Sequence, residues 1–289
     1  QMGVGPAYST KTIRNGLRMG DLFSDRSVVR EKIQELVTYF AKYSEFDSSR
    51  VDVEQIVDDH LKYLEILRPC IVDTVALMAG HLASGHTIVC EGANSVMSDL
   101  DFGTYPYVTS SNTTPGSASI GLGIPPTKIS KIIGVCKAYT TRSQHWFPSI
   151  LSLSTEEEVI KHIVAAGNEN NTKRPSQTNT PVPSRRVGWL DLVQVKYASE
   201  ICGFDAIALT KLDVLSGLAR VGLVTSYANW DVDTLGYPAT EEEFRSLDPR
   251  VEYFPGWSDS LASVTCFADL PKAAQVFVER IEEVLHTKI

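Results

Sequence analysis

The segment from Glu91 to Gly116 constrains the fold more than any other part of this 289-residue sequence. It reads EGANSVMSDLDFGTYPYVTSSNTTPG and directly follows the apolar run Thr87–Cys90. We interpret the run as a β-strand and Glu91–Asn94 as the glycine-bearing turn that ends it. In open α/β folds such turns lie at the carboxyl edge of the sheet, where ligands bind. The segment therefore predicts the floor of a site for a polar ligand.

The second half of this segment, Val108–Gly116, is rich in hydroxyl groups. If its glycine lets the backbone approach a ligand, the segment also offers N–H groups suited to a phosphate. The alternative is an ordinary solvent-exposed loop, because clusters of Ser, Thr, Asn and Gly commonly connect regular elements. Composition by itself leaves both alternatives open.

Apolar periodicity predicts regular elements on both sides of this segment. The expected helices are Val28–Tyr43, Val51–Leu82 with a break or kink at Pro69, Thr155–Ala166, Trp189–Ile201 and Pro271–His286. The expected strands are Ile129–Tyr139, Ala206–Leu209, Leu218–Tyr227 and Val251–Phe254. We therefore expect an α/β fold with a mixed, largely parallel central sheet flanked by helices. A single domain over residues 1–289 would contain a helical section at about 28–85, and the polar, proline-bearing run 168–184 would be a mobile loop.

The net charge says little about which ligand or macromolecule this chain binds. The formal net charge is −8, which gives no indication of a nucleic-acid partner. A protein of this charge that binds nucleotides needs local positive charge, so individual arginines matter more than the total. Arg14 and Arg18 are four residues apart, and on a helix they would share a face able to grip one anion. A solvated basic face is the alternative.

Cysteine, histidine and hydropathy patterns favour a cytoplasmic protein. The five cysteines are scattered without a CxxC pair, and we expect reduced, buried thiols at Cys70, Cys90, Cys136, Cys202 and Cys266. No signal peptide and no apolar run long enough to span a bilayer is evident, so no membrane partner is expected. His60, His81 and His86 have no partner at metal-ligand spacing and are expected to be structural or surface residues.

Several motifs together resemble one enzyme family. Glu91–Asn94, Asp99–Pro106 and Val108–Thr114 look like the central signature of the adenylosuccinate synthetases. Further blocks follow in family order at Gly3–Tyr8 with Arg14–Phe23, Lys137–Arg142, Gly188–Asp191, Leu209–Leu215 and Pro255–Trp257. The resemblance covers nearly the whole chain and implies a P-loop-NTPase-like fold, here incomplete. The family's N-terminal phosphate-loop segment and its extreme C-terminus have no counterpart in this sequence.

The resemblance implies a GTP-dependent ligase of purine (AMP) biosynthesis, a cytoplasmic homodimer that joins IMP and L-aspartate to give adenylosuccinate with the help of Mg²⁺. It assigns IMP binding to Arg14, Asn94 and Thr109, with Arg14 reaching the neighbouring subunit's site. GTP binding falls to Arg185, Lys211, Leu212 and Asp213, and Arg185 also falls near aspartate. The catalytic base and acid and the Mg²⁺ ligands would lie in a preceding segment, so we expect this chain to be inactive by itself.

Two segments depart from the family pattern. Residues 143–150 keep Phe147 and Pro148 but lose the glycines of the family loop, and larger side chains there would crowd a nucleotide. Residues 168–184 replace a Thr-Thr-Gly turn that is followed by arginines. The alternative function is therefore a divergent, catalytically inactive homologue that acts as a nucleotide-binding or dimerising structural protein.

Overall fold

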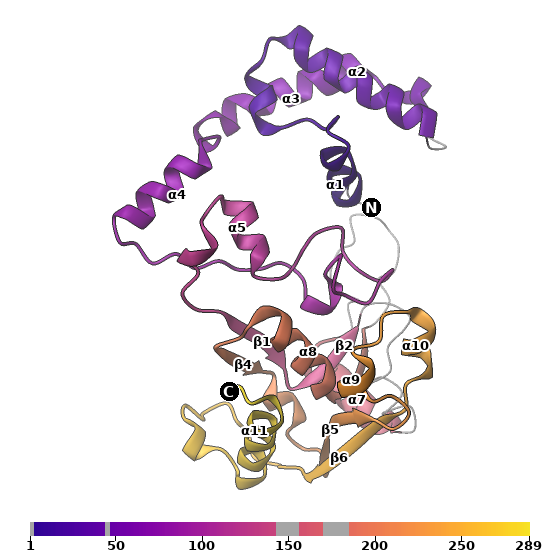
Figure 1. Cartoon of the computed structure of the whole chain (residues 1–289), viewed down its shortest axis with the longest axis vertical. Helices are drawn as coiled ribbons and strands as arrows, with labels where there is room; N and C mark the ends of the chain where they lie inside the picture. Colours follow the sequence, from indigo (N-terminus) through magenta and orange to yellow (C-terminus); the bar gives the residue numbers. More distant parts are fainter. Residues whose placement is uncertain (1–2, 44–46, 143–155, 170–184) are drawn as a thin grey trace. The chain divides into compact units, whose positions relative to one another are not determined.

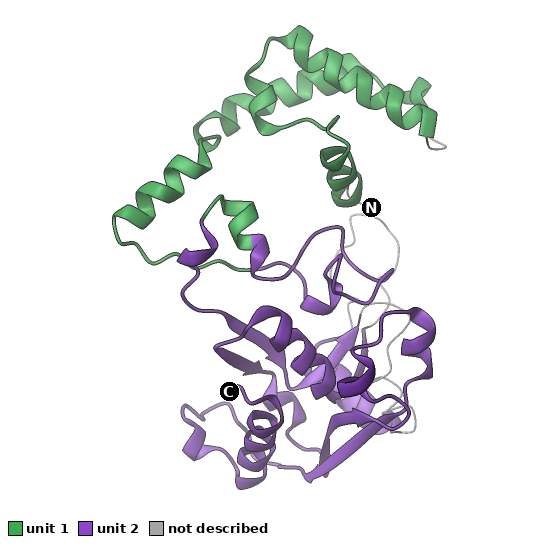
Figure 2. Ribbon diagram, in the orientation of Figure 1, with its two compact units in different colours: residues 1–91, 118–124 green, residues 92–117, 125–289 purple. Residues whose placement is uncertain are grey.

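A computed structural model describes residues 3–43, 47–142, 156–169 and 185–289 (Figure 1). The described chain forms two compact units, residues 1–91 with 118–124 and residues 92–117 with 125–289 (Figure 2). We call them unit 1 and unit 2 and describe each by itself. That the whole chain forms one domain stays a prediction, and the loop expected at 168–184 lies mostly outside the described residues.

Unit 1 is helical. Its helices are α1 (Val4–Thr12), α2 (Arg26–Tyr43), α3 (Val53–Leu67) and α4 (Thr74–Ala83), and α5 (Gly116–Leu122) begins in unit 2 and ends in unit 1. Helices α2 and α3 pack through the buried side chains of Val29, Ile33 and Val57. The predicted break at Pro69 is confirmed, because a 3₁₀ turn at Arg68–Cys70 separates α3 from α4.

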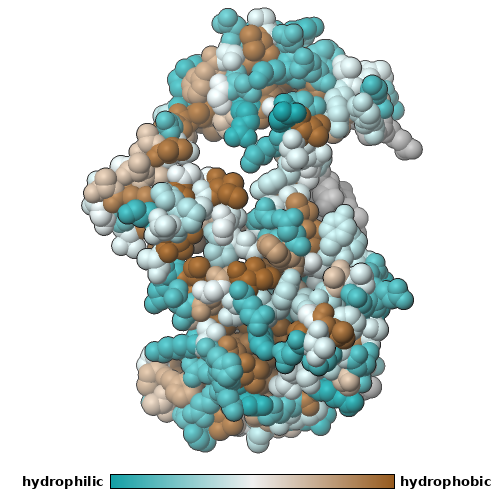
Figure 3. Space-filling model, viewed as in Figure 1, coloured by the Kyte–Doolittle hydropathy of each residue, from teal (hydrophilic) through white to brown (hydrophobic). Residues whose placement is uncertain are grey.

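Within Val53–Ala83 an 18-residue window has a mean hydropathy of 1.4, so by length and composition the stretch is apolar enough to cross a membrane. The expectation that no such run exists was therefore wrong. The stretch is nevertheless interrupted by the 3₁₀ turn and by residues 71–73, and Asp73 caps the second helix. Apolar side chains of α4, Val75 and Leu77 among them, are exposed on unit 1 (Figure 3).

The described residues of unit 2 contain two sheets, one of two strands and one of four. Strands β1 (Ile133–Lys137) and β4 (Ala206–Thr210) pair in parallel. Strand β2 (Tyr139–Arg142) continues from β1 and pairs with β3 (Arg186–Asp191) in antiparallel fashion. Strand β5 (Arg220–Tyr227) pairs in parallel with β3 and antiparallel with β6 (Pro249–Pro255). The two-stranded sheet is thus parallel and the four-stranded sheet is mixed, and the predicted α/β fold is confirmed.

Five helices of unit 2 surround these strands in the described residues: α7 (Glu157–Ala166), α8 (Leu192–Cys202), α9 (Val232–Leu235), α10 (Glu241–Ser246) and α11 (Lys272–Leu285) (Figure 1). The core between strands and helices includes the fully buried side chains of Tyr139, Trp189, Leu223 and Phe277. Burial of these large apolar surfaces is the main source of stability for the sheets that carry the site.

The structure corrects three local predictions. Thr87–Cys90 is not a strand: no described strand pairs with it, and Val89 is 89% exposed. A β-branched run becomes a strand only where another backbone satisfies its hydrogen bonds. Residues 189–191 belong to β3 rather than to a helix, because Asp191 caps α8 and the helix begins after it. Cys70, Cys90 and Cys266 are exposed, although all five cysteines are free as expected.

Candidate functional site

The loop between Glu91 and Gly116 folds around the carboxylate of Asp99, which is fully buried. One carboxylate oxygen of Asp99 accepts hydrogen bonds from the backbone N–H groups of Asp101 at 2.9 Å and Phe102 at 3.1 Å. The other oxygen accepts from the backbone N–H of Thr113 at 2.5 Å. Gly103 closes the turn, where a Cβ would lie 2.4 Å from the Asp99 carbonyl oxygen. The polar stretch is therefore a defined loop and not a loose connection.

Asn94 and Thr109, the predicted IMP-binding residues of unit 2, lie at the two ends of this loop. Asn94 has a left-handed backbone with φ of +68°, which asparagine tolerates better than most residues, and its side chain is exposed. Thr109 is half-buried, and its backbone N–H donates to the Ser98 carbonyl at 2.8 Å. Thr113 ties the same ends together by donating its hydroxyl to the Ser95 carbonyl at 2.9 Å.

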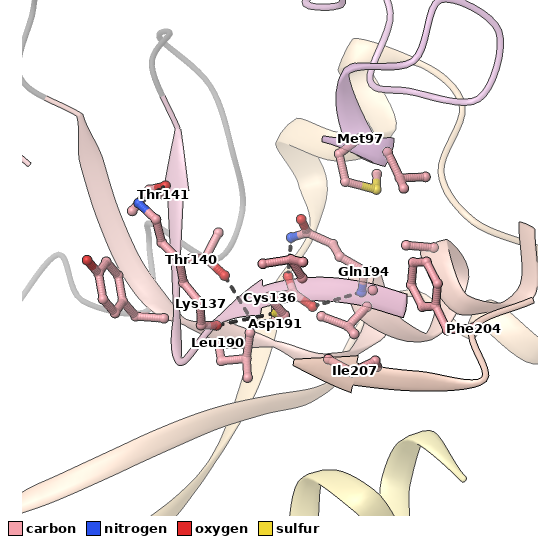
Figure 4. Close-up of a pocket in the computed structure, with 16 residues that line it drawn as sticks. Met97, Cys136, Lys137, Thr140, Thr141, Leu190, Asp191, Gln194, Phe204 and Ile207 are labelled. Carbon is pink, nitrogen blue, oxygen red and sulfur yellow. Dashed lines mark hydrogen bonds between the residues drawn. The ribbon is translucent and has the colours of Figure 1, made fainter. Parts of the chain in front are cut away.

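A cavity of about 250 Å³ lies beside this loop in unit 2 (Figure 4). It is bounded by the turn that contains Met97, by β1, by the end of β3 and by α8. Its apolar side is formed by Met97, Phe204 and Ile207, and its polar side by the residues Lys137, Thr140, Thr141, Asp191 and Gln194. This mixture of an apolar wall and a few polar groups suits a ligand with a flat apolar body and polar edges.

Asp191 is the most perturbed acid of the cavity wall. Burial raises the pKa of its carboxyl group to about 6. Its oxygens accept from the Tyr227 hydroxyl at 2.9 Å, from the Gln194 side-chain amide at 2.5 Å and from the backbone N–H of Val193 at 3.1 Å. These bonds fix the end of β3 and the start of α8. Asp191 therefore shapes the cavity, while its lone pairs are engaged within the protein.

The predicted guanine-reading residues follow β4. Lys211 has a left-handed backbone with φ of +64°, and Leu212 and Asp213 begin the 3₁₀ turn Leu212–Leu215. The side chains of Lys211 and Asp213 are exposed, and Leu212 is half-buried. The Lys211 ammonium donates to the Gly167 carbonyl at 3.5 Å. The carboxylate of Asp213 is thus presented to solvent next to a lysine whose end is anchored.

Arg185 lies close to the same place, at the start of β3. Its guanidinium is 3.6 Å from the carboxylate of Glu169, and its backbone N–H donates to the Glu169 carbonyl at 3.4 Å. Arg185 and Lys211 therefore both contact the turn that follows α7, at Glu169 and at Gly167, and Asp213 lies two residues after Lys211.

Comparison with known proteins gives the family of this chain. The family model described as adenylosuccinate synthetase matches residues 1–289. The chain belongs to the adenylosuccinate synthetase family. Adenylosuccinate synthetase 1 of Laccaria bicolor is 40% identical over 288 residues, which are 99% of this chain and 64% of the relative. The synthetase of Trichoplax adhaerens is 38% identical over 97% of this chain and 61% of its own length.

A solved structure, that of fully ligated adenylosuccinate synthetase from Plasmodium falciparum, is 35% identical with a TM-score of 0.87. It matches 100% of this chain, and the match covers 66% of that structure's chain. This chain therefore spans somewhat less than two thirds of the length of its synthetase relatives. The family fold predicted from the sequence is confirmed.

One residue assigned by the family resemblance lies in the other unit. Arg14 belongs to unit 1, beyond the end of α1, and has a left-handed backbone with φ of +67°. Arg18 has an extended backbone before the 3₁₀ turn Met19–Phe23. Arg14 and Arg18 therefore do not share a helix face, because the helix ends at Thr12. The departures from the family at 143–150 and within 170–184 lie outside the described residues.

Sequence reasoning missed two buried carboxylates that lie among the candidate site residues, Asp99 and Glu169. Asp99 lies inside the recognised signature, but no role follows from the sequence for it. Glu169 lies at the edge of a polar run and reads as an ordinary loop acid. The one available signal was the location of each acid in a family block or beside one, and only the fold shows what each carboxylate contacts.

Proposed function

We propose that this chain functions in purine nucleotide biosynthesis, in the GTP-dependent ligation of IMP and L-aspartate to adenylosuccinate. It would supply residues that position IMP and guanine, while the catalytic base and acid would come from another segment. The observation that carries the proposal is that Arg185 and Lys211 contact one turn, with Asp213 two residues after Lys211, in a family member. Cytoplasmic location and a homodimer without nucleic acid or membrane belong to the same proposal.

The exposed Asp213 carboxylate is suited to select guanine. Guanine presents two parallel donors, its N1–H and its 2-amino group, and a carboxylate offers two acceptors at matching spacing. Adenine carries an acceptor at N1, so it would meet the carboxylate unfavourably. The aliphatic stem of Lys211 can cover the base, because its ammonium group is anchored to the Gly167 carbonyl. Leu212 lies between them and contributes backbone to the same turn.

The loop around Asp99 is suited to IMP. The exposed carboxamide of Asn94 offers both a donor and an acceptor for the purine edge, and the Thr109 hydroxyl offers a donor for the phosphate. Arg14 would complete the phosphate site from a second copy of the chain. Arg185, with its planar fork of donors, would serve GTP and the carboxylates of aspartate.

The Mg²⁺ expected for the family does not fit the described residues of this chain. No group of three or more histidine, cysteine, aspartate or glutamate side chains gathers there in a way that could hold a metal ion. Magnesium prefers six oxygen ligands in octahedral geometry. We therefore derive no step of the reaction through a metal at these residues.

Nucleotide titration tests the guanine assignment. We expect the protein to bind GTP in preference to ATP in isothermal titration calorimetry. Asp213→Asn should weaken GTP binding by roughly 30-fold, because one acceptor becomes a donor at a cost of about 2 kcal/mol. The control Asp259→Asn changes a similarly exposed acid and should leave GTP binding unchanged. Equal affinity for GTP and ATP in the wild type would contradict the assignment.

A turnover assay tests whether the catalytic base and acid lie in another segment. We expect no adenylosuccinate from these 289 residues alone, measured by the absorbance change with IMP, GTP, aspartate and Mg²⁺. Turnover by this chain would refute the assignment of base and acid to another segment. A full-length protein that contains this chain should be active. Nucleotide binding without turnover in that protein would favour the inactive homologue that the altered residues 143–150 and 168–184 suggest.

A further inference from the structure

Glu169 is a buried carboxylate that none of the assignments above uses. It is 4% exposed and follows α7. One of its carboxylate oxygens accepts from the Lys137 ammonium at 2.5 Å and from the Tyr139 hydroxyl at 2.7 Å. The other oxygen faces the guanidinium of Arg185 at 3.6 Å. Burying an ionised acid costs desolvation free energy even when a hydroxyl and two cations surround it, so the position of Glu169 calls for an explanation.

The backbone around Glu169 connects the same groups. Gly167 ends α7, and a Cβ there would lie 2.3 Å from the Tyr139 hydroxyl oxygen, so only glycine lets that hydroxyl reach Glu169. The Gly167 carbonyl accepts from Lys211, and the Glu169 carbonyl accepts from the backbone N–H of Arg185. The turn at residues 167–169 therefore links Arg185 to the lysine that precedes Asp213.

The charges around Glu169 orient Arg185 without cancelling its charge. Burial acts to raise the pKa of Glu169, but hydrogen bonds from Lys137 and Tyr139 lower it by more, so the group is ionised at neutral pH. The contact with Lys137 is much shorter than the contact with Arg185. The carboxylate is thus compensated mainly by Lys137, and Arg185 keeps donors and charge for an anion.

We propose that Glu169 is a positioning residue that holds the guanidinium of Arg185 toward an anionic ligand beside the guanine-reading turn. The ligand class is a nucleoside triphosphate, so the inference rests on the proposed function. An arginine held in place loses less side-chain entropy when it binds. Releasing it should therefore weaken binding without removing any group that touches the ligand.

The test is a double-mutant cycle on GTP affinity. Glu169→Gln keeps the shape and one acceptor but removes the charge that faces Arg185, and GTP binding should weaken by about tenfold. Arg185→Ala should weaken it at least as much. In the Arg185→Ala background, Glu169→Gln should have no further effect, because the residue acts through the arginine. Equal losses in both backgrounds, or no loss in the first, would overturn the proposal.

A matched control and a ligand-free measurement complete the test. Glu252→Gln removes an acid that pairs with Arg280 at 3.1 Å, and GTP affinity should not change. In side-chain ¹⁵N relaxation, the Arg185 Nε–H should be ordered in the wild type and should reorient faster in Glu169→Gln. Equal mobility in both proteins overturns the proposal whatever the ligand result. Absence of GTP binding in a wild type with an ordered Arg185 instead refutes the proposed function.

If Glu169→Gln does not fold, Glu169→Asp replaces it. Aspartate keeps the charge but is one methylene shorter, so it cannot reach Lys137 and Arg185 together. We expect the same weakening of GTP binding in the wild-type background and none in the Arg185→Ala background. Losses that add in the two backgrounds would show a general structural role and would overturn the proposal.

Discussion

Replacing Asp99 with asparagine tests whether one carboxylate holds the Glu91–Gly116 loop together. The buried carboxylate accepts from the backbone N–H groups of Asp101, Phe102 and Thr113. A carboxamide has the same shape but only one acceptor oxygen, and its NH₂ group is a donor. Whichever way it turns, at least one backbone N–H faces an N–H group instead of an oxygen. The loop then loses at least one of the three backbone hydrogen bonds that the carboxylate accepts.

The cost follows from the number of bonds that asparagine cannot make. Hydrogen bonds to a charged group contribute about 1.5–3 kcal/mol, and a buried donor left without an acceptor adds its own desolvation cost. We expect Asp99→Asn to lower the free energy of local opening by about 2–3 kcal/mol. At 1.4 kcal/mol per factor of ten, the equilibrium constant for opening of the loop should increase by roughly 30- to 150-fold.

Amide hydrogen exchange at Thr113 reads this opening directly. Its exchange should accelerate by the factor above in Asp99→Asn, while amides of β5 keep their protection. The control Asp73→Asn changes an exposed acid that also accepts two backbone N–H bonds, at the start of α4. Asparagine caps helices as well as aspartate does, so that variant should change local stability by only a few tenths of a kcal/mol. An unchanged exchange rate at Thr113 would refute the role of Asp99.

The same residue gives a pH dependence with a defined sign. Burial acts to raise the pKa of Asp99, but the backbone bonds from Thr113, Asp101 and Phe102 lower it by more, so the net shift is downward. Because the pKa is lowered in the folded loop, the ionised carboxylate stabilises the loop at every pH above the pKa of the unfolded state, about 3.9. Protection at Thr113 should therefore fade in the wild type as pH falls below about 4, and the variant should lack that step.

Two further predictions concern the core of unit 2. Burial raises the pKa of Asp191 to about 6, so its ionisation costs stability as pH rises from about 4 to 6, by about 3 kcal/mol in all. Asp191→Asn, which stays neutral, should flatten the pH dependence of unfolding in that window, and an unchanged urea midpoint profile would contradict this. Phe277→Ala removes a fully buried ring from α11 and should lower the free energy of unfolding by about 3–5 kcal/mol in urea titrations. A loss below about 1 kcal/mol would show that the cavity collapses.

Local sequence patterns predicted most of the regular structure. The helices at Arg26–Tyr43 and Val53–Leu67 follow apolar periodicity, and the break after them follows Pro69. The same signals failed at Thr87–Cys90, where the residues suit a strand but no described backbone pairs with them. They failed again at Trp189, where an apolar stretch fits a strand or a helix until Asp191 is seen to cap the helix that follows. The pairing partner of a strand is distant in the sequence, and a capping residue is recognised only together with the helix that it caps. Apolar periodicity therefore predicts neither.

The sequence by itself determined the α/β class and the family, because a long ordered set of motifs is specific whatever their positions in space. It also placed Lys211 and Asp213 together at a strand end, since they are neighbours in the chain. Only the tertiary structure decided that Arg185 joins them through Glu169, with Lys137 and Tyr139 on the same carboxylate. These four residues come from separate parts of the chain: the end of β1, the start of β2, the residue before β3 and the turn after α7. Their contacts arise from sheet pairing and from the burial of one charge, which no single stretch of sequence encodes.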